Sequence, residues 1–362
     1  MVNVKSGVLI EDIENLAYSI KEELLLKGTT LLITGATGLI GSLIVQAVLR
    51  SNHKYHTNIS LVLLVRDRKR AEGMFGDSDV CEDLFFVEGD VADPACICRI
   101  KESRKKIDYL IHAASVTQSK EIVTHPVETI RMMAVGTQNM LELCVSHQIR
   151  GMVFLSSMEI YGRLPFSEEK TGENSYGKID FLSSRGSYPE GKRLAECLCH
   201  AYSEEYQVPV RIARLAQTFG PGVSIKDNRV FMQFAKSVIT RQDIILHTQG
   251  ESMANYCYTV DCIRGLFQIL LYGKNGEAYN VVNEAASMKI KEVAQLVADE
   301  ISDKQIRVKI AVGKETALYA PDTGLWLSGE KLRRLGWRPE YDLPEMFQRL
   351  VEDLKVLEEF HV

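Results

Sequence analysis

The sequence predicts an α/β fold in which a doubly wound parallel sheet is joined to a smaller, interleaved C-terminal lobe. The first observation is the apolar run 30–34, which has the pattern of a buried strand and leads directly into the glycine-rich segment 35–41. The second is the helical apolar period that follows this segment. The third is a series of later short apolar runs that end in polar or small residues and supply further strands.

Composition limits the classes of function. With 362 residues, 46% hydrophobic and 25% charged, the chain has the profile of a soluble globular protein that is large enough for two lobes. A net charge of −5 lacks the basic excess of a nucleic-acid-binding protein. No apolar run reaches the length of a membrane-spanning helix, and residues 1–7 lack a signal-peptide pattern. We therefore expect a cytoplasmic protein without nucleic-acid or membrane partners.

Eight cysteines raise the question of disulfides or a metal site. Cys96 and Cys98 are separated by one residue, as are Cys197 and Cys199, so neither pair is CxxC, and no histidine cluster accompanies them. We expect reduced thiols and no metal, with zinc as the alternative.

Residues 1–29 are predicted to form a helical extension. Ile13, Leu16, Ile20 and Leu24 recur at intervals of three or four, and Gly28 follows as a stop signal for a helix over about 10–27. We assign no chemistry to this helix and expect it to pack on the outside of the domain.

The segment after the first strand has the glycines that a dinucleotide requires. Among Gly35, Gly38 and Gly41, one makes the tight turn, one lets a pyrophosphate approach the backbone, and one lets the helix pack on the strand. The N-terminus of that helix then faces the phosphates. Glycines alone are a weak signal, but between a strand and a helix they predict a nucleotide site. The other residues assigned to it here are Thr37, Leu39 and Ile40.

The ends of the next strands supply further contacts for this nucleotide. The second strand, 59–65, ends at Arg66-Asp67-Arg68, where an acidic side chain would hold the ribose of NAD and an arginine the 2′-phosphate of NADP. Both types are present, so this segment leaves the cofactor open, and a solvated charged loop is the alternative. The third and fourth strands, 84–88 and 107–111, are followed by the assigned residues Asp90, Val91, Ala113 and Ala114.

A helix is predicted over 127–146 and a fifth strand over 152–155. The segment 157–161 follows at the carboxyl end of that strand, where doubly wound folds place their ligands. A serine-rich stretch after a strand is usually only a turn, but this one lies about thirty residues before a second candidate motif.

That motif is Tyr188 and Lys192, which are four residues apart and share one face of a predicted helix. Pro189 stands in the first turn, where its missing N–H costs nothing. A nearby ammonium stabilises a phenolate, so the pair predicts a tyrosine whose pKa is lowered from about 10 and which can take a proton from an alcohol. A surface tyrosine and a solvated lysine at a chance spacing are the alternative.

Together these motifs resemble the extended short-chain dehydrogenase/reductase family, in its nucleotide-sugar epimerase, dehydratase and decarboxylase branch. The three glycines, the segment 157–161 and the Tyr188–Lys192 pair occur in the order and at the spacing of that family. The segments 214–221, 276–281 and 335–337 resemble later family segments, so the likeness extends from about residue 30 to the end.

The resemblance implies a Rossmann domain and a role for each site residue. Tyr188 removes a proton from a sugar hydroxyl, Lys192 binds the nicotinamide ribose and lowers the pKa of Tyr188, and Ser157 bonds the reacting oxygen. A redox-neutral cycle favours tightly held NAD, and Arg66 leaves NADP open. The substrate-binding residues are Ser115, Thr117, Ser157, Gln217 and Arg229.

Two adjacent residues favour one reaction within this branch. Glu159 stands where dehydratases and decarboxylases of the family carry a glutamate, and Met158 replaces the acid that 4,6-dehydration needs. The resemblance therefore favours a UDP-glucuronate decarboxylase-like enzyme with Glu159 directed towards the sugar. A 4-epimerase is the alternative, and an NADPH-dependent ketone reductase is the alternative of another class. A structural role for Glu159, capping a backbone group, also stays open.

Two positions depart from the family pattern. Ala254 stands where relatives usually carry an arginine for the nucleotide phosphates, so either Arg229 serves instead or the substrate is not a UDP-sugar. Met133 stands where relatives often carry an asparagine that supports the proton relay.

The resemblance also implies how the chain is divided and what it binds. The expected partners are a nucleotide sugar, with a UDP-sugar favoured, and a second copy of the chain through helices 127–146 and 188–206. The expected lobes are an NAD(P)-binding domain of residues 30–215 with about 255–283, and a substrate lobe of residues 216–254 and 284–362.

Overall fold

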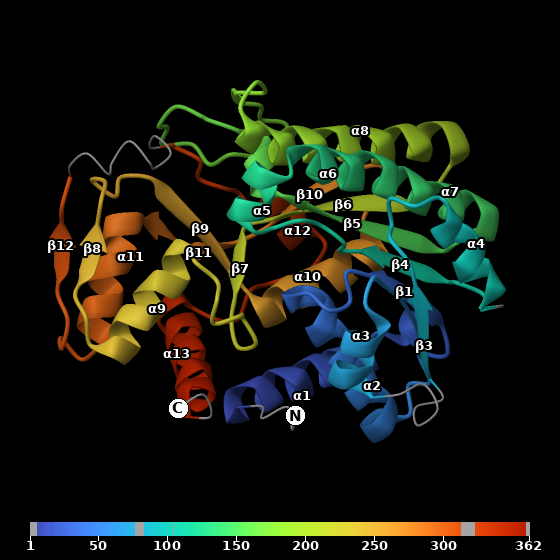
Figure 1. Ribbon diagram of the computed structural model, residues 1–362, viewed down its shortest axis with the longest axis horizontal. Helices are drawn as coiled ribbons and strands as arrows, with labels where there is room; N and C mark the ends of the chain where they lie inside the picture. The colour runs from blue at the N-terminus through green and yellow to red at the C-terminus, as the bar shows by residue number, and fades with distance from the viewer. Residues whose placement is uncertain (1–5, 77–82, 104, 313–322, 360–362) are drawn as a thin grey trace.

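The computed structural model describes residues 6–76, 83–103, 105–312 and 323–359. Its centre is a sheet of seven parallel strands in the order β10-β6-β5-β4-β1-β2-β3 (Figure 1). This order confirms the predicted doubly wound α/β fold. The strands are β1 (Thr30–Thr34), β2 (Ser60–Val65), β3 (Leu84–Glu88), β4 (Tyr109–His112), β5 (Gly151–Ser157), β6 (Val210–Leu215) and β10 (Ala278–Val281).

Helices cover both faces of this sheet (Figure 1). Because successive side chains of a strand point to opposite faces, Leu31 and Ile33 belong to one apolar core and Leu32 to the other. The first face carries α1 (Gly7–Glu22), α2 (Leu39–Tyr55), α3 (Arg68–Phe75) and α10 (Thr259–Tyr272). The second carries α4 (Ala95–Glu102), α5 (Ser119–Thr124), α6 (Pro126–Arg131), α7 (Thr137–His147) and α8 (Ser187–Tyr206).

The five predicted strands are present, with ends that differ by at most two residues from those expected. The predicted helix 127–146 is also present, but a π-helical turn (Met132–Gly136) separates α6 from α7. This turn presses against α8, since a Cβ on Gly191 would lie 3.1 Å from the Met133 side chain. Close packing of this kind holds the first turns of α8 in place at the edge of the sheet.

The C-terminal part of the chain builds smaller sheets beside the main one (Figure 1). One sheet has the order β11-β9-β7 and the other pairs β12 with β8. Within the segment 255–283, β10 joins the main sheet while β9 lies in the three-stranded one. The elements are β7 (Gln217–Phe219), β8 (Ile244–Leu246), β9 (Met253–Tyr258), β11 (Asn283–Lys289), β12 (Val308–Ile310), α9 (Val230–Thr240), α11 (Ile290–Leu296), α12 (Glu330–Arg334) and α13 (Leu343–Glu359).

The N-terminal helix connects parts of the chain that are far apart in sequence. It ends at Glu22, earlier than expected, and a short 3₁₀ helix (Leu24–Leu26) follows it. α1 packs against α2 and α10 of the main domain and against α13. Its buried Asp12 accepts hydrogen bonds from the Tyr258 hydroxyl at 2.6 Å and from Arg349 Nη2 at 2.7 Å.

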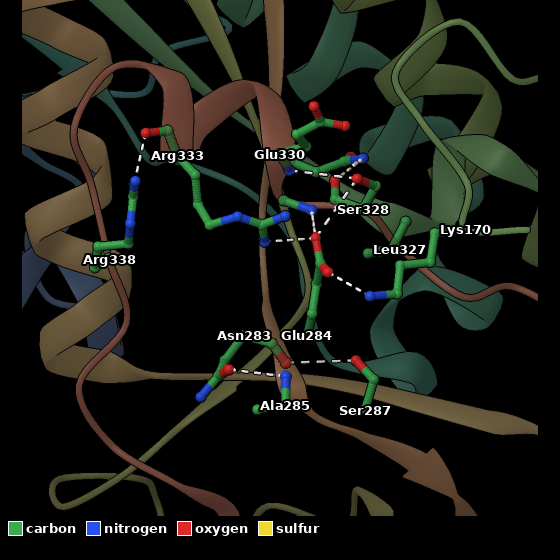
Figure 2. Close-up of polar contacts among 12 residues, drawn as sticks. Lys170, Asn283, Glu284, Ala285, Ser287, Leu327, Ser328, Glu330, Arg333 and Arg338 are labelled. Atoms are coloured by element: carbon green, nitrogen blue, oxygen red, sulfur yellow. Dashed lines mark hydrogen bonds and ion pairs between the residues drawn. The ribbon is translucent and has the colours of Figure 1, made fainter.

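A long connection between β5 and α8 is anchored to the C-terminal part by one carboxylate. Figure 2 shows that the Glu284 carboxylate of β11 accepts hydrogen bonds from Lys170 of this connection and from Arg333 of α12. Each donor–acceptor distance is 2.5 Å. The backbone N–H of Gly329 donates to the same carboxylate at 2.7 Å. Thr171 also makes a β-bridge with Leu327. These contacts anchor the connection around residues 170–171, well before α8 begins at Ser187.

The cysteines in the described residues are all free thiols. Cys197 is exposed and Cys199 is buried, so the two thiols lie on different faces of α8. Cys81 lies outside the described residues. Over those same residues no group of His, Cys, Asp and Glu side chains could hold a metal, and no helix is long and apolar enough to cross a membrane.

Candidate active site

A cavity of about 550 Å³ opens at the carboxyl ends of the parallel strands. Every residue that the sequence analysis assigned to catalysis, cofactor or substrate lines this cavity, although the residues come from many separate segments. They are Gly35, Thr37, Gly38, Leu39, Ile40, Gly41, Arg66, Asp90, Val91, Ala113, Ala114, Ser115, Thr117, Ser157, Glu159, Tyr188, Lys192, Gln217 and Arg229.

The turn between β1 and α2 fits the pyrophosphate of a dinucleotide. Gly35 has a φ of +71°, and a Cβ there would lie 2.7 Å from the Ala113 backbone. A Cβ on Gly41 would collide with the Gly35 carbonyl oxygen. The N-cap of α2 is Gly38, which makes no side-chain cap, so the first N–H groups of the helix stay available to an anion.

The end of β2 presents guanidinium groups to this cavity. Arg66 and Arg70 line it, whereas the carboxylate of Asp67 caps α3 by accepting from the Arg70 backbone N–H at 2.9 Å. Asp90, at the end of β3, lines the cavity and accepts from the backbone N–H of Ala92 at 2.8 Å.

The candidate base lies on α8 beside the end of β5. Pro189 is the third residue of α8, where its missing N–H is no loss, and Tyr188 precedes it. Ser157 is the last residue of β5, and Ser115 follows β4. Both serine hydroxyls are near enough to the Tyr188 hydroxyl to lower its pKa. A phenol and two hydroxyls therefore converge where a sugar oxygen would sit.

The expected lowering of the Tyr188 pKa is wrong for the structure described here. Burial raises the pKa of Tyr188 to about 12, and the negative charge of Glu159 adds to the increase. The Ser157 hydrogen bond, the charge of Arg185 and the Ser115 hydrogen bond act in the opposite direction but do not offset it. The loss of water around the phenol outweighs the nearby cation.

Lys192 does not direct its charge at the phenol. Its Nζ donates to the Leu155 carbonyl at 2.6 Å, and it lies 5.9 Å from the centre of the Tyr188 ring. Burial lowers the pKa of Lys192 to about 7, although the charge of Glu196 partly offsets this. The ammonium is therefore itself poorly stabilised in this buried position.

Glu159 is held by an arginine that the sequence analysis missed. Nη2 of Arg185 donates to both carboxylate oxygens, at 2.7 and 2.6 Å. Glu159 thus neither caps a backbone group nor extends freely towards the sugar. Its own N–H donates to Ser157 Oγ at 3.2 Å, so the ion pair is attached to a site residue. The sequence signal that could have identified Arg185 is its position three residues before Tyr188, within about one helical turn.

The other polar residues assigned to the site differ in whether their side chains already have hydrogen-bond partners. Both Nε and Nη2 of Arg229 donate to the Asp227 carboxylate, so this candidate phosphate ligand already has a partner. Gln217 Oε1 is buried without a hydrogen bond among the described residues. Ala254 is buried in β9 and does not line the cavity, and Met133 packs against Tyr188.

The model of the NAD dependent epimerase/dehydratase family matches residues 31–282. UDP-glucuronic acid decarboxylase 6 of Arabidopsis thaliana is 26% identical over 90% of this chain and 89% of its own length. UDP-glucuronic acid decarboxylase 1 of Xenopus tropicalis is 28% identical over 89% of this chain and 71% of its own. An epimerase from Methanothermobacter thermautotrophicus superposes with a TM-score of 0.76 at 21% identity, over 95% of this chain and 96% of that one.

Proposed function

This chain belongs to the NAD dependent epimerase/dehydratase family, and we propose that it decarboxylates a UDP-linked uronic acid through a transient 4-keto sugar. The similarity to UDP-glucuronic acid decarboxylases supports the substrate class. The single observation that carries the proposal is the Glu159–Arg185 ion pair in the cavity beside Tyr188. A plain 4-epimerase only turns over a neutral keto sugar and gains nothing from such a pair.

The proposed cycle uses few residues of the chain. NAD held in this cavity would supply a reversible hydride acceptor for C4. Ser157 holds the C4 oxygen, and Tyr188 takes the hydroxyl proton as the C4 ketone forms. The C5 carboxylate is then β to a ketone, so the C5–C6 bond breaks, CO₂ leaves and the electron pair moves onto the C4 oxygen. A solvent proton adds at C5, and Tyr188 returns its proton to the C4 oxygen as the C4 ketone is reduced.

The pKa of about 12 means that Tyr188 begins as a neutral phenol at pH 7. A neutral phenol cannot accept the proton of the sugar hydroxyl. A positive charge must therefore first come close enough to stabilise the phenolate and release the phenol proton. Arg185, in the 3₁₀ turn just before α8, already acts in this direction, and Lys192 of α8 is a second cation, 5.9 Å from the centre of the Tyr188 ring. We propose that these two cations support the phenolate during the first step.

The reaction is tested by incubating the purified protein with UDP-glucuronate and NAD. We expect UDP-xylose and CO₂ in equal amounts with no net consumption of NAD. Inversion of a UDP-hexose at C4 with the uronate untouched would replace this proposal with 4-epimerisation. Stoichiometric consumption of NADPH would replace it with ketone reduction, which the position of Arg66 in the cavity favours.

Assembly, location and domain division complete the proposal. We propose a homodimer, because exposed apolar side chains occur on α6 and on α8, including Val127, Ile130 and Leu194. The free thiols favour the cytoplasm. We retain residues 30–215 with about 255–283 as the cofactor domain and residues 216–254 with 284–362 as the substrate lobe. Strands β7, β9 and β11 form one sheet that crosses the boundary between these two parts.

A further inference from the structure

The N-terminal helix reaches the loop between β7 and α9 through one buried carboxylate. Asp353 of α13 is 2% exposed, so its side chain needs hydrogen-bond donors from the protein. One of its oxygens accepts from the hydroxyl of Ser6, the residue that caps the start of α1. The other oxygen accepts from the backbone N–H of Gly222 at 2.8 Å. The start of α1 and the loop 220–229 therefore meet at the same side chain.

The loop 220–229 reaches the catalytic cavity. Its last residue, Arg229, lines the cavity and is the N-cap of α9. Gly222 has a φ of +87°, a conformation that glycine adopts without strain. A Cβ on Gly222 would lie 3.7 Å from Cδ1 of Leu9 in α1 and 3.8 Å from Cδ1 of Leu39. Because Leu39 begins α2 and lines the cavity, the loop lies between α1 and the cofactor cradle.

A second contact of α1 fixes the strands from which this loop starts. Asp12 accepts a hydrogen bond from the hydroxyl of Tyr258, the last residue of β9. Tyr258 is paired with Phe219, the last residue of β7, and the loop begins at the next residue. α1 also packs against α13, which carries Asp353 (Figure 1). The N-terminal helix thus holds the loop both at its start and at Gly222.

Apolar packing alone would be enough to dock α1 on the domain. Ile13, Leu16 and Ile20 are buried in the same apolar core as β1 and α2. Asp353 adds nothing to that packing, and burying a carboxylate costs solvation energy that an apolar side chain would not lose. What the carboxylate adds is direction, because a hydrogen bond holds the backbone of Gly222 at one place.

We propose that Asp353, held by Ser6, is a positioning residue that sets the loop 220–229 and with it the place of Arg229 in the cavity. The N-terminal extension thereby belongs to the substrate-binding apparatus. The inference rests on the proposed function for the nucleotide sugar that occupies this part of the cavity. Asp353 does not line the cavity, so its effect passes through the loop. It should therefore change the binding of the nucleotide sugar and leave the binding of NAD unchanged.

The test measures by calorimetry how tightly the NAD-loaded protein binds UDP-glucuronate, and separately how tightly the protein binds NAD. Asp353→Ala removes the acceptor of both hydrogen bonds, and we expect it to weaken UDP-glucuronate binding about tenfold while the NAD affinity stays within about twofold. Asp353→Asn keeps an oxygen for the Gly222 N–H and should restore most of the affinity. Glu14→Gln is the matched control, since it removes the ion pairs of α1 with Arg50 and Lys54 and leaves the loop untouched. Unchanged UDP-glucuronate binding in Asp353→Ala, or an equal loss for both ligands, overturns the inference.

Hydrogen exchange of the loop gives a second readout that needs no substrate. The amides of residues 220–229 should exchange several-fold faster in Asp353→Ala and in Ser6→Ala than in wild type, while those of β5 and α8 keep their wild-type rates. Ser6→Ala also covers the case in which Asp353→Ala does not fold. Loop amides that exchange at the wild-type rate in Ser6→Ala, or faster exchange spread evenly over the chain, overturn the inference.

The outcomes separate this inference from the proposed reaction. If Asp353→Ala loses affinity for UDP-glucuronate but wild type forms no CO₂, the reaction fails and the inference stands. If CO₂ forms and Asp353→Ala binds UDP-glucuronate as wild type does, the inference fails alone. If wild type does not bind UDP-glucuronate, the proposed substrate fails and the exchange of the loop amides decides the inference.

Discussion

Tyr188 shows how strongly a single residue depends on its surroundings. Removing the phenol oxygen with Tyr188→Phe keeps the ring that packs against Met133 and Ile122. We expect the melting temperature and NAD affinity to stay close to those of wild type, and CO₂ release to fall by about a hundredfold or more because the general base is lost. Single-turnover kinetics with UDP-glucuronate and calorimetry with NAD measure the two quantities.

Tyr161 provides the matched control for that substitution. It is buried and its hydroxyl donates to Asn280 at 2.6 Å, but it does not line the cavity. Tyr161→Phe should therefore reduce stability and leave turnover largely intact. If Tyr188→Phe turns over the substrate at the wild-type rate, Tyr188 is not part of the mechanism.

At the scale of elements, α1 carries a pH-dependent contact through Asp12. Burial raises the pKa of Asp12 from 3.8 to about 6, even though Tyr258 and Arg349 bond the carboxylate. The folded chain thus holds this proton more tightly than the unfolded chain. The resulting stability is fully present below about pH 4 and is lost as the pH rises through about 6.

Asp12→Asn removes this titration while keeping a neutral side chain of the same shape. Between pH 4 and pH 7, we expect the free energy of unfolding of the variant to rise relative to that of wild type by about 3 kcal/mol, which corresponds to about two pKa units. Urea unfolding at the two pH values measures the difference. Glu22→Gln, at the exposed end of α1, is the control and should show no such trend. A constant difference between Asp12→Asn and wild type would contradict the argument.

At the scale of the whole molecule, the exposed apolar surface bears on assembly. Val127 is 73% exposed at the start of α6, and Leu194 is 46% exposed on α8. We expect a two-fold dimer at micromolar concentration because these side chains would gain from burial against a second copy. Val127→Glu places a charge in that interface and should give monomers in sedimentation analysis.

Leu24→Glu is the control for the dimer, since Leu24 is 79% exposed but lies in the N-terminal extension. It should leave the assembly unchanged. A monomeric wild type at this concentration, or a Val127→Glu variant that remains dimeric, would contradict an interface formed by helices 127–146 and 188–206 of both copies.

Local patterns in the sequence were sufficient for the main elements and for the lining of the cavity. The glycines, the strand ends and the Tyr188–Lys192 spacing all describe neighbours along the chain. In a parallel sheet, the carboxyl ends of the strands meet at one edge, so residues assigned separately to those ends necessarily come together there. This is why Gly35, Asp90 and Ser157 line one cavity although their segments are far apart.

The sequence by itself determined the fold class and the cofactor cradle, because these depend on local periodicity and spacing. The family resemblance supplied the substrate-binding candidates, such as Gln217 and Arg229. Only the tertiary structure decided which charges meet. Glu159 and Arg185 are 26 residues apart, and Asp12 and Tyr258 are 246 apart, so no local pattern pairs them. The tertiary structure also decided the burial of Tyr188 and Lys192. Because desolvation penalises the charged form of each group, burial reversed the expected pKa shift of Tyr188.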